Sequence, residues 1–363
     1  MKVVLSCGGT GGHIYPAIAI ADKIKEHHPD AEILFIGTKL GMENDLVPKA
    51  GYKIVGIDAK GIDRKNLLKN IETVVTYFEG SHEVKRILKE FKPDVVIGTG
   101  GYVTGSVISQ AHRLGIKCCI HEQNAVPGVA NKYLSGNADK VFISFEGTEK
   151  AFRHPERVTL TGNPIRSSFT ALDREECRKA LGLSPEDKMV LVFGGSLGAE
   201  VLNRETLGLV DEMAGSGIKL YFVTGKRYYE KIKAAVDSKA GTEGLTLIAY
   251  ADNMPQLMSA ADLVVSRAGA IAVSEITASG KPSVLVPSPN VTNNHQYHNA
   301  KAVADAGAAL LIEEKDLPEG GNVLAKKVLE LAKDSAKLQQ MSADAARIGR
   351  VDAAEVIYKN LEL

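Results

Sequence analysis

The chain lacks the features of a membrane-spanning, secreted or nucleic-acid-binding protein. No hydrophobic run in its 363 residues approaches the roughly 18–20 residues of a membrane-spanning helix. The N-terminus enters a strand pattern directly, without the apolar stretch and small-residue cleavage site of a signal peptide. The 44 Lys and Arg residues equal the 44 Asp and Glu residues, and a net charge of zero argues against nucleic acid as the main partner. We therefore expect an intracellular globular protein.

Further absences narrow the chemistry. Cys7, Cys118, Cys119 and Cys177 lack the paired spacing of zinc or disulfide motifs, which predicts reduced and mostly buried thiols. No Asp-x-Asp sequence occurs, so the common carboxylate device for holding a metal–nucleotide complex is missing. No Gly-x-x-x-x-Gly-Lys-Ser/Thr sequence occurs either, which argues against a P-loop nucleotide hydrolase. We expect no bound metal and no cofactor.

Strand-like apolar runs alternate with helix-length segments along the whole chain. The length exceeds one ordinary core, so two domains of about 150–200 residues are expected. Most runs are continuous Val, Ile and Leu segments, as in parallel strands covered on both faces, and the rhythm predicts doubly wound α/β domains. The predicted strands are residues 3–6, 32–36, 53–57, 94–98, 117–121 and 140–144, then 189–193, 219–223, 245–249, 262–266, 283–286 and 309–312.

A turn-rich stretch, Thr161-Gly162-Asn163-Pro164, lies between the two sets of strands and precedes a polar helix pattern. It places the domain boundary after residue 163. Residues 320–363 contain two further helix patterns rich in Ala, Leu and Lys.

Each half opens with a glycine-rich loop that follows an apolar run. The first is Gly8-Gly9-Thr10-Gly11-Gly12-His13, and the second is Gly194-Gly195-Ser196-Leu197-Gly198-Ala199. Such glycines let the backbone turn tightly into a helix and approach a ligand closely. In open α/β sheets ligands bind beyond the carboxyl ends of the strands. The two loops therefore predict one ligand-binding edge on each sheet, facing each other across a cleft.

The segment 266–275 predicts an anion site in the second half. A strand ends at Ser266, small residues turn the chain, and a helix begins near Ala270, so free backbone N–H groups and the helix dipole suit a diphosphate. Glu275 lies about one turn into that helix, where its carboxylate could accept both hydroxyls of a ribose. The alternative interpretation is a first-turn acid that the helix dipole favours.

Several other polar residues are either ligand-binding or catalytic groups, or ordinary structural residues. The cluster 293–299 could hydrogen-bond sugar hydroxyls, or it is a solvated helix start. Arg166 could neutralise a phosphate, although a single exposed arginine is uninformative. His13 and Glu122 are the candidate bases of the first half, because histidine titrates near neutrality and lies beside a glycine loop. Alternatively, His13 caps or packs the first helix.

Residues 64–78 form an amphipathic helix pattern with basic residues at its start. It is either a core-facing helix or an apolar patch with a basic rim that lies on an anionic membrane surface. The slight positive excess of residues 1–163, 21 Lys and Arg against 18 Asp and Glu, weakly favours the membrane surface. The patch residues are Leu67, Leu68, Ile71, Val75 and Phe78.

Seven motifs in order along the chain together resemble one family, the glycosyltransferases of family 28, and within it the N-acetylglucosaminyltransferases of bacterial cell-wall synthesis. The motifs are 8–13, 100–102, 121–124, 162–166, 194–199, 267–275 and 295–296. The resemblance implies the GT-B fold, in which two Rossmann-like domains flank a cleft and the C-terminal one binds the donor nucleotide. It also implies a final helix that returns to the N-terminal domain. The expected domains are residues 1–163, 164–340 and 341–363.

The resemblance also implies roles for individual residues. Ala251 would read uracil, Glu275 the ribose, and Ala270, Ile271 and Ala272 with Ser196 and Arg166 the diphosphate. Gln296, Asn124, Thr10, Gly11 and Gly12 would approach the donor sugar. His13 would be the base or bind the acceptor, and Gly9, Gly100, Gly101 and Tyr102 would lie near the acceptor and its phosphates. His295 stands where some members have a second glutamine, so its contact to the sugar differs.

The implied reaction is attack by the 4-hydroxyl of the muramyl sugar of lipid I on UDP-N-acetylglucosamine (UDP-GlcNAc), with inversion and without a metal. The implied location is the cytoplasmic face of the cell membrane, bound peripherally, with other cell-wall synthesis proteins as further partners. Four alternatives are a sugar-nucleotide epimerase, another GT-B UDP-sugar transferase, a solute-binding protein and a dinucleotide-dependent oxidoreductase. The last would need an acidic residue at the end of the second strand, which instead ends Ile36-Gly37-Thr38-Lys39.

Overall fold

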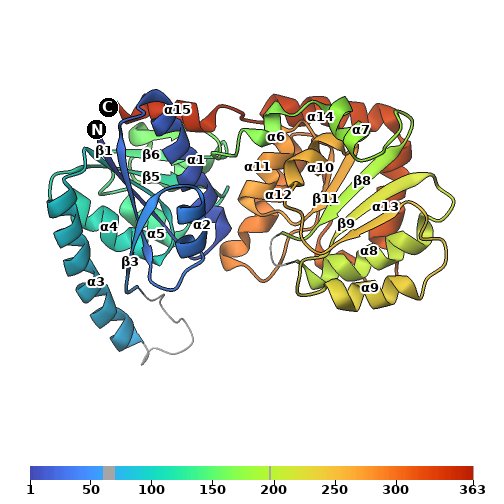
Figure 1. The fold of residues 1–363 in the computed structure, drawn as a ribbon, viewed down its shortest axis with the longest axis horizontal. Coiled ribbons are helices and arrows are strands. Elements are labelled where there is room, and N and C mark those ends of the chain that lie inside the picture. Colours follow the sequence, from blue (N-terminus) through green and yellow to red (C-terminus); the bar gives the residue numbers. More distant parts are fainter. Residues whose placement is uncertain (60–69, 196–197, 363) are drawn as a thin grey trace. The chain divides into compact units, whose positions relative to one another are not determined.

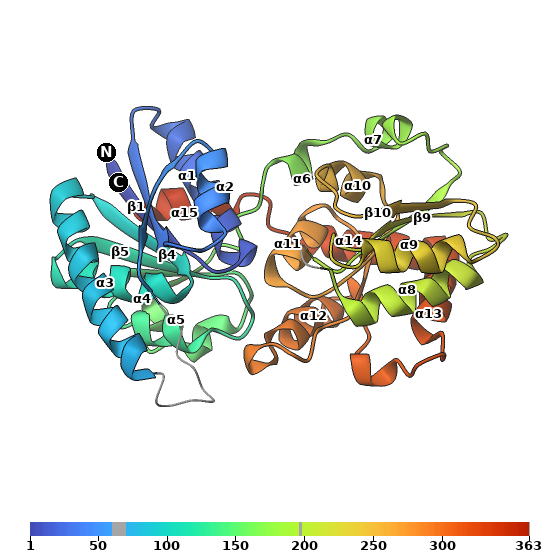
Figure 2. The same cartoon turned by 60° about the horizontal axis from the view of Figure 1, so that its bottom comes forward.

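The computed structural model describes residues 1–59, 70–195 and 198–362, and only the backbone of residues 70–78. The chain divides into two compact units, Met1–Arg166 with Asp352–Leu363, and Ser167–Val351. Figures 1 and 2 show that each unit is a sheet covered by helices. None of the helices in the described part is long and apolar enough to cross a membrane.

The first unit contains a seven-stranded parallel sheet in the order β3-β2-β1-β4-β5-β6-β7. The strands are β1 (Lys2–Cys7), β2 (Glu32–Thr38), β3 (Lys53–Ile57), β4 (Val95–Gly100), β5 (Lys117–Glu122), β6 (Lys140–Ile143) and β7 (Val158–Leu160). The α-helices are α1 (Gly11–His27), α2 (Glu43–Lys49), α3 (Asn70–Phe91), α4 (Tyr102–Arg113), α5 (Val129–Leu134) and α15 (Ala353–Leu361). Two 3-10 helices, η2 (Thr148–Ala151) and η3 (Pro155–Arg157), precede β7.

Both faces of the first sheet are buried, which explains its continuous apolar strands. Successive side chains of a strand point to opposite faces. In the central strand β1, Val3 and Leu5 pack in one cluster with residues of α1 and α15, whereas Val4 packs in a second cluster with residues of α3 and α4. The predicted parallel sheet between helical layers is confirmed for this unit.

The second unit contains a six-stranded parallel sheet in the order β10-β9-β8-β11-β12-β13. The strands are β8 (Lys188–Phe193), β9 (Ile218–Val223), β10 (Leu245–Ile248), β11 (Leu263–Ser266), β12 (Ser283–Leu285) and β13 (Ala309–Leu311). The α-helices are α6 (Ser168–Ala171), α7 (Arg174–Ala180), α8 (Glu200–Glu212), α9 (Tyr229–Asp237), α10 (Met254–Ala260), α11 (Ala270–Ala278), α12 (His295–Asp305), α13 (Val323–Lys333) and α14 (Ser335–Ile348), with 3-10 helices η4 (Thr292–Asn294) and η5 (Glu314–Asp316).

The boundaries between the units differ from the predicted residues 163 and 340. The structure divides the chain after Arg166 and again after Val351. Helix α14 runs through residue 341 without a break, because Met341 on its buried face packs into the core of the second unit and Ala345 is also buried. Only α15, after the helix end at Gly349, joins the first unit.

All four cysteines lie in the described part of the chain, and all are buried and free of disulfides. Burial raises the pKa of Cys118 and of Cys119 to about 12. Both thiols therefore stay protonated at neutral pH and behave as small apolar side chains of the core.

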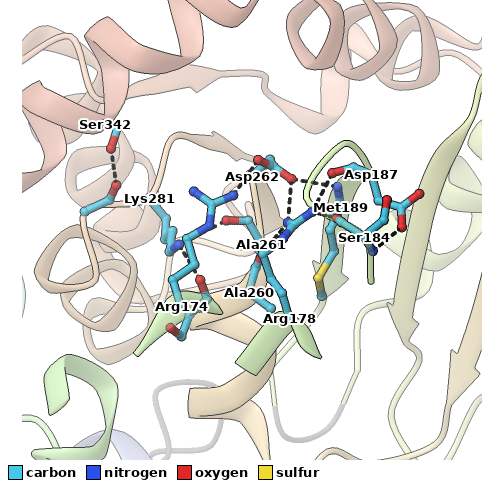
Figure 3. Close-up of polar contacts among 12 residues, drawn as sticks. Arg174, Arg178, Ser184, Asp187, Met189, Ala260, Ala261, Asp262, Lys281 and Ser342 are labelled. Carbon is cyan, nitrogen blue, oxygen red and sulfur yellow. Dashed lines mark hydrogen bonds and ion pairs between the residues drawn. The ribbon is translucent and has the colours of Figure 1, made fainter. Parts of the chain in front are cut away.

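A partly buried charged cluster lies at the amino-terminal edge of the second sheet, as Figure 3 shows. Asp262, just before β11, accepts hydrogen bonds from Arg174 (2.7 Å) and Arg178 (3.2 Å) of α7 and from the backbone N–H of Met189 (2.8 Å). Arg178 also donates to three backbone carbonyls in neighbouring segments, those of Ser184, Asp187 and Ala260. The cluster thus ties α7 and α10 to the sheet at the edge opposite the glycine-rich loop.

Lys281 lies beside this cluster, and its burial lowers the pKa of its ammonium group. Its ammonium group donates to the carbonyls of Ser259 (2.6 Å) and Ala261 (3.0 Å) at the end of α10. Burial, reinforced by the nearby Arg174, lowers the pKa of Lys281 to about 8. The folded protein therefore releases this proton at a lower pH than the unfolded chain does.

We predict that wild-type protein gains stability relative to Lys281→Met as the pH rises from about 8 toward the ordinary lysine pKa of about 10.4. In that window the unfolded chain binds more protons at Lys281 than the folded protein does, so the free energy of unfolding rises with pH. Urea unfolding of both proteins at several pH values measures the difference in their free energies of unfolding. Cysteine and tyrosine titrations contribute equally to both proteins and therefore cancel in this difference. A pH-independent difference would contradict the prediction.

Candidate active site

The glycine-rich loop of the first unit packs directly against the loop that follows β4. Gly101 has a φ of +96°, and a Cβ on it would lie 2.5 Å from the carbonyl oxygen of Gly8. Gly100 has a φ of +119°, and its Cβ would lie 2.4 Å from Nδ1 of His13. Both positions therefore require glycine, for the left-handed backbone and for the close approach. Tyr102 follows as the first residue of α4 and is exposed.

His13 lies in the first turn of α1 with its imidazole oriented by two acceptors. Its Nδ1 lies 3.0 Å from the carbonyl oxygen of Thr99 and 3.2 Å from Oε1 of Gln123. Because a carbonyl oxygen only accepts, the proton of the neutral ring is assigned to Nδ1. The Nε2 atom then keeps its lone pair. The side chain is half-buried, so this ring combines a fixed orientation with partial access.

Gln123 and His121 set the direction of the hydrogen bonds behind His13. His121 is fully buried, and burial, with a smaller contribution from His13, lowers its pKa to about 4, so it is neutral near pH 7. Its Nε2 donates to the carbonyl of Gly162 (3.0 Å), which leaves Nδ1 to accept from Nε2 of Gln123 (2.9 Å). The amide nitrogen also donates to Thr99 (2.6 Å), so the amide oxygen faces His13.

Glu122, the second candidate base, is buried in a ring of donors. Oε1 accepts from the backbone N–H (3.0 Å) and the side-chain amide (3.2 Å) of Asn124. Oε2 accepts from the N–H of Gly128 (3.0 Å) and from Nδ2 of Asn131 (2.8 Å). Because both oxygens of Glu122 accept hydrogen bonds from residues 124–131, this carboxylate holds the loop after β5 in place. Of the two candidates, His13 has the geometry that better suits a base.

Arg166 ends the first unit, and its guanidinium lies over the ring of Tyr15 in α1, 5.4 Å from the ring centre. Such a contact between a guanidinium and an aromatic face restricts the positions that the arginine side chain adopts. Tyr15 also packs on the glycine-rich loop, since a Cβ on Gly11 would lie 3.1 Å from its ring. Arg166 is thereby linked to the same loop as His13.

In the second unit, α11 starts as the sequence predicts, at Ala270, after the loop that follows β11. Its N-cap is Gly269, and neither a side-chain cap nor an acidic residue occupies its first turn. Its first N–H groups are backbone donors of three apolar residues, Ala270, Ile271 and Ala272, and free N–H groups at a helix start suit an anion. Glu275 is the sixth residue, so the first-turn acid interpretation does not apply to it.

Helix α12 brings the polar cluster 293–299 to the same edge of the second sheet. Asn293 and Asn294 both adopt left-handed backbone angles, φ 55° and 50°. Oε1 of Gln296 accepts from the N–H of Ser288 (2.9 Å), which leaves its amide nitrogen to donate, and Nδ1 of His295 donates to the carbonyl of Thr292 (2.9 Å). A cavity of about 360 Å3 borders these segments, lined by Pro287, Pro289, Asn294, Tyr297, Glu313, Glu314 and Lys315.

Of the remaining predicted site residues, some lie within the described part of the chain and others lie outside it. Ala251 lies in the loop between β10 and α10, next to Tyr250, whose ring has the Lys226 ammonium 5.0 Å from its centre. Ser196, Leu67 and Leu68 lie outside the described residues, as do the side chains of Ile71, Val75 and Phe78. Across the described residues, no group of three or more His, Cys, Asp or Glu side chains could hold a metal ion.

The roles of Gln123 and His121 were not assigned from sequence, although both lie in a motif that was singled out. The signal that could have found them is the His-x-Gln spacing at the end of β5, which places both side chains on one side of the strand.

Two parallel sheets, each with glycine-rich loops and polar residues at the carboxyl ends of its strands, are the architecture of the GT-B fold. The glycosyltransferase family 28 N-terminal domain matches residues 3–143, and the family 28 C-terminal domain matches residues 189–357. The chain belongs to glycosyltransferase family 28. The prediction of this family and fold is confirmed.

Curated relatives match along the full length. Proteins of Alkaliphilus oremlandii and Acetivibrio thermocellus are 42% and 45% identical over 362 and 360 residues, covering 100% and 99% of this chain and 98% and 97% of their own. Both are named UDP-N-acetylglucosamine–N-acetylmuramyl-(pentapeptide) pyrophosphoryl-undecaprenol N-acetylglucosamine transferase. These relatives place the chain among the N-acetylglucosaminyltransferases of the family.

Solved structures agree on the fold. MurG of Acinetobacter baumannii is 26% identical with a TM-score of 0.80, covering 99% of both chains. A UDP-GlcNAc 2-epimerase of Neisseria meningitidis has a TM-score of 0.69 at 17% identity, covering 99% of both chains, and shares the fold alone.

Proposed function

We propose that this chain transfers N-acetylglucosamine from UDP-GlcNAc to the 4-hydroxyl of the muramyl sugar in undecaprenyl-pyrophosphoryl-MurNAc-pentapeptide (lipid I), giving lipid II for peptidoglycan. The observation that carries the proposal is the 42–45% identity, over the whole chain, to transferases named for these two substrates. The reaction forms a bond from the acceptor oxygen to the anomeric carbon and breaks the bond from that carbon to UDP.

His13 is the proposed base of this reaction. With Nδ1–H held by Thr99 and Gln123, the Nε2 lone pair takes the proton of the acceptor hydroxyl as the new bond forms. Direct displacement by one nucleophile inverts the α-linked donor to a β-linked product. Gly9, Gly100, Gly101 and Tyr102, on the loops beside His13, are the proposed contacts to the acceptor and its phosphates.

The second unit holds the donor nucleotide in this proposal. The N-terminus of α11 stabilises the charge that develops on the departing diphosphate, with Arg166 as an additional cation. Ala251 would read uracil, Glu275 the ribose, and Ser196 the diphosphate. Gln296, His295, Asn124, Thr10, Gly11 and Gly12 are proposed contacts to the sugar. These donors replace the metal ion that other nucleotide-sugar enzymes use to balance the same charge.

The acceptor's chemistry supports a membrane-surface location. Burying an acyl chain in a bilayer contributes about 0.8 kcal/mol per methylene, so a long polyprenol stays in the membrane and the enzyme must come to it. We propose peripheral binding at the cytoplasmic face, where other cell-wall synthesis proteins are candidate partners. We propose that the patch of Leu67, Leu68, Ile71, Val75 and Phe78 contacts the membrane, so the protein should co-sediment with anionic liposomes.

Chelation should leave the transfer largely intact. With UDP-GlcNAc and a soluble lipid I analogue, we expect the rate in excess EDTA to stay within about twofold of the untreated rate, because the helix dipole and the arginine already provide the electrostatic stabilisation.

The new glycosidic bond should be a β-linkage, which its proton coupling constant identifies. Strict dependence on a divalent ion would contradict the metal-independent step, and an α-linked product would contradict inversion. Epimerised sugar nucleotide formed without acceptor would indicate an epimerase.

A further inference from the structure

Glu43 joins the glycine-rich loop of the first unit to the neighbouring strand. It is the first residue of α2, and its side chain is fully buried. Oε1 accepts from the backbone N–H (2.9 Å) and the hydroxyl (2.6 Å) of Thr38 at the end of β2. Oε2 accepts from the backbone N–H of Gly9 (3.2 Å). One carboxylate therefore spans the loops that follow β1 and β2.

Three glycines leave the space that this carboxylate fills. A Cβ on Gly41 would lie 2.1 Å from Oε2 of Glu43, and a Cβ on Gly8 would lie 2.7 Å from Oε1. A Cβ on Gly37 would lie 2.7 Å from Cγ of the same side chain. Contacts this short do not occur between real atoms, so a side chain at any of these three positions would displace the Glu43 side chain from this geometry. The chain forms a fitted cradle of backbone around one acidic group.

The carboxylate is ionised in this cradle. Burial opposes ionisation, but the hydrogen bonds from Thr38 and from the N–H of Gly9 outweigh it and place the pKa of Glu43 below its ordinary value. An ionised carboxylate accepts shorter and stronger hydrogen bonds than a neutral group. The link to Gly9 is thus a charge-assisted bond to a residue with a left-handed φ of +85°.

Gly9 precedes the start of α1, where the carbonyl of Thr10 accepts from the N–H of His13 (3.0 Å). Fixing Gly9 therefore fixes the segment that sets the position of the His13 ring. We propose that Glu43 is a positioning residue that holds the glycine-rich loop, and through it His13, in the geometry for transfer. This proposal rests on the proposed function of His13, although the tether itself does not.

Glu43→Gln is the direct test. The amide keeps the shape but has one oxygen, which we expect to stay with the two donors of Thr38, so that the amide nitrogen meets the N–H of Gly9 and the tether breaks. We expect kcat to fall about 10–100-fold, the effect of a small misplacement of a catalytic group, with the KM for UDP-GlcNAc changed less than about threefold. Amide hydrogen exchange of the peptide covering residues 8–13 should become faster.

Val47→Ala is the matched control, because Val47 is fully buried on the same helix and packs in the core away from the carboxylate. It should lower the melting temperature while leaving kcat and loop exchange close to wild type. If Val47→Ala reduces kcat as much as Glu43→Gln at equal loss of stability, Glu43 is merely structural and the proposal fails. Unchanged kcat and unchanged exchange in Glu43→Gln also overturn it.

Thr38→Val covers the case in which Glu43→Gln does not fold. It removes one hydrogen-bond donor from Oε1 of Glu43 while leaving the charge of Glu43. It should therefore lower kcat a few-fold and speed amide exchange in the peptide covering residues 8–13; no change in either overturns the proposal.

Wild-type protein that fails to glycosylate the lipid I analogue would refute the proposed function. Exchange at residues 8–13 in Glu43→Gln would still decide whether the tether exists.

Discussion

Replacing His13 with alanine is expected to lower kcat for GlcNAc transfer about 1,000-fold, because a positioned general base contributes about 10²–10⁴-fold to a rate. The variant loses the imidazole whose Nδ1 is held by the carbonyl of Thr99 and the side chain of Gln123. Binding of UDP-GlcNAc, measured by calorimetry, should change little.

Two variants make this result specific. His154→Ala removes a partly exposed histidine of the same unit, paired with Glu156, and should keep wild-type kcat. Glu122→Gln places an amide in the ring of donors around Glu122, so it should destabilise the loop after β5 and lower activity through stability. If His13→Ala retains more than about a tenth of the activity while a folded Glu122→Gln is inactive, the base is Glu122.

The strands were predictable because their physics is local to the sequence. A strand covered on both faces must be apolar at every position, and the runs of β1 and β8 show this directly. β7 was missed because Val158–Leu160 is a three-residue edge strand with a threonine in the middle and only half-buried positions. The end of the chain was read as two helices, whereas it forms α13, α14 and α15, separated by short breaks near residues 334 and 350.

The loops of the site were predictable for a related reason. Glycine at the end of an apolar run marks a backbone that must turn or approach closely, and Gly100 and Gly101 meet both conditions. What the sequence could not show is the partner of each side chain. His13 meets the Thr99 carbonyl across 86 residues, and Gly9 meets Glu43 across 34. Such pairs depend on which strands are neighbours in the sheet, which one sequence does not encode in any local pattern.

Glu275 carries the second large effect. Helical side chains tilt toward the N-terminus of their helix, so the sixth residue of α11 leans back toward the end where the diphosphate is proposed to bind. A carboxylate there can accept from both ribose hydroxyls, and hydrogen bonds to a charged group contribute about 1.5–3 kcal/mol each. Losing both bonds costs about 3 kcal/mol or more, so Glu275→Ala should raise the KM for UDP-GlcNAc at least about 100-fold, with kcat at saturating donor within about threefold of wild type.

Glu200→Ala is the control for Glu275→Ala, since Glu200 is an exposed acid in the first turn of α8 in the same unit. It should leave the donor KM unchanged. The nucleotide analogue with a 2′-deoxyribose separates ribose recognition from a general loss of negative charge. Wild-type protein should bind this analogue more weakly than UDP-GlcNAc, whereas Glu275→Ala should discriminate little between the two. A normal donor KM in Glu275→Ala would show that the ribose is held elsewhere, and the assignment of α11 as the nucleotide helix would then rest on its N-terminal N–H groups alone.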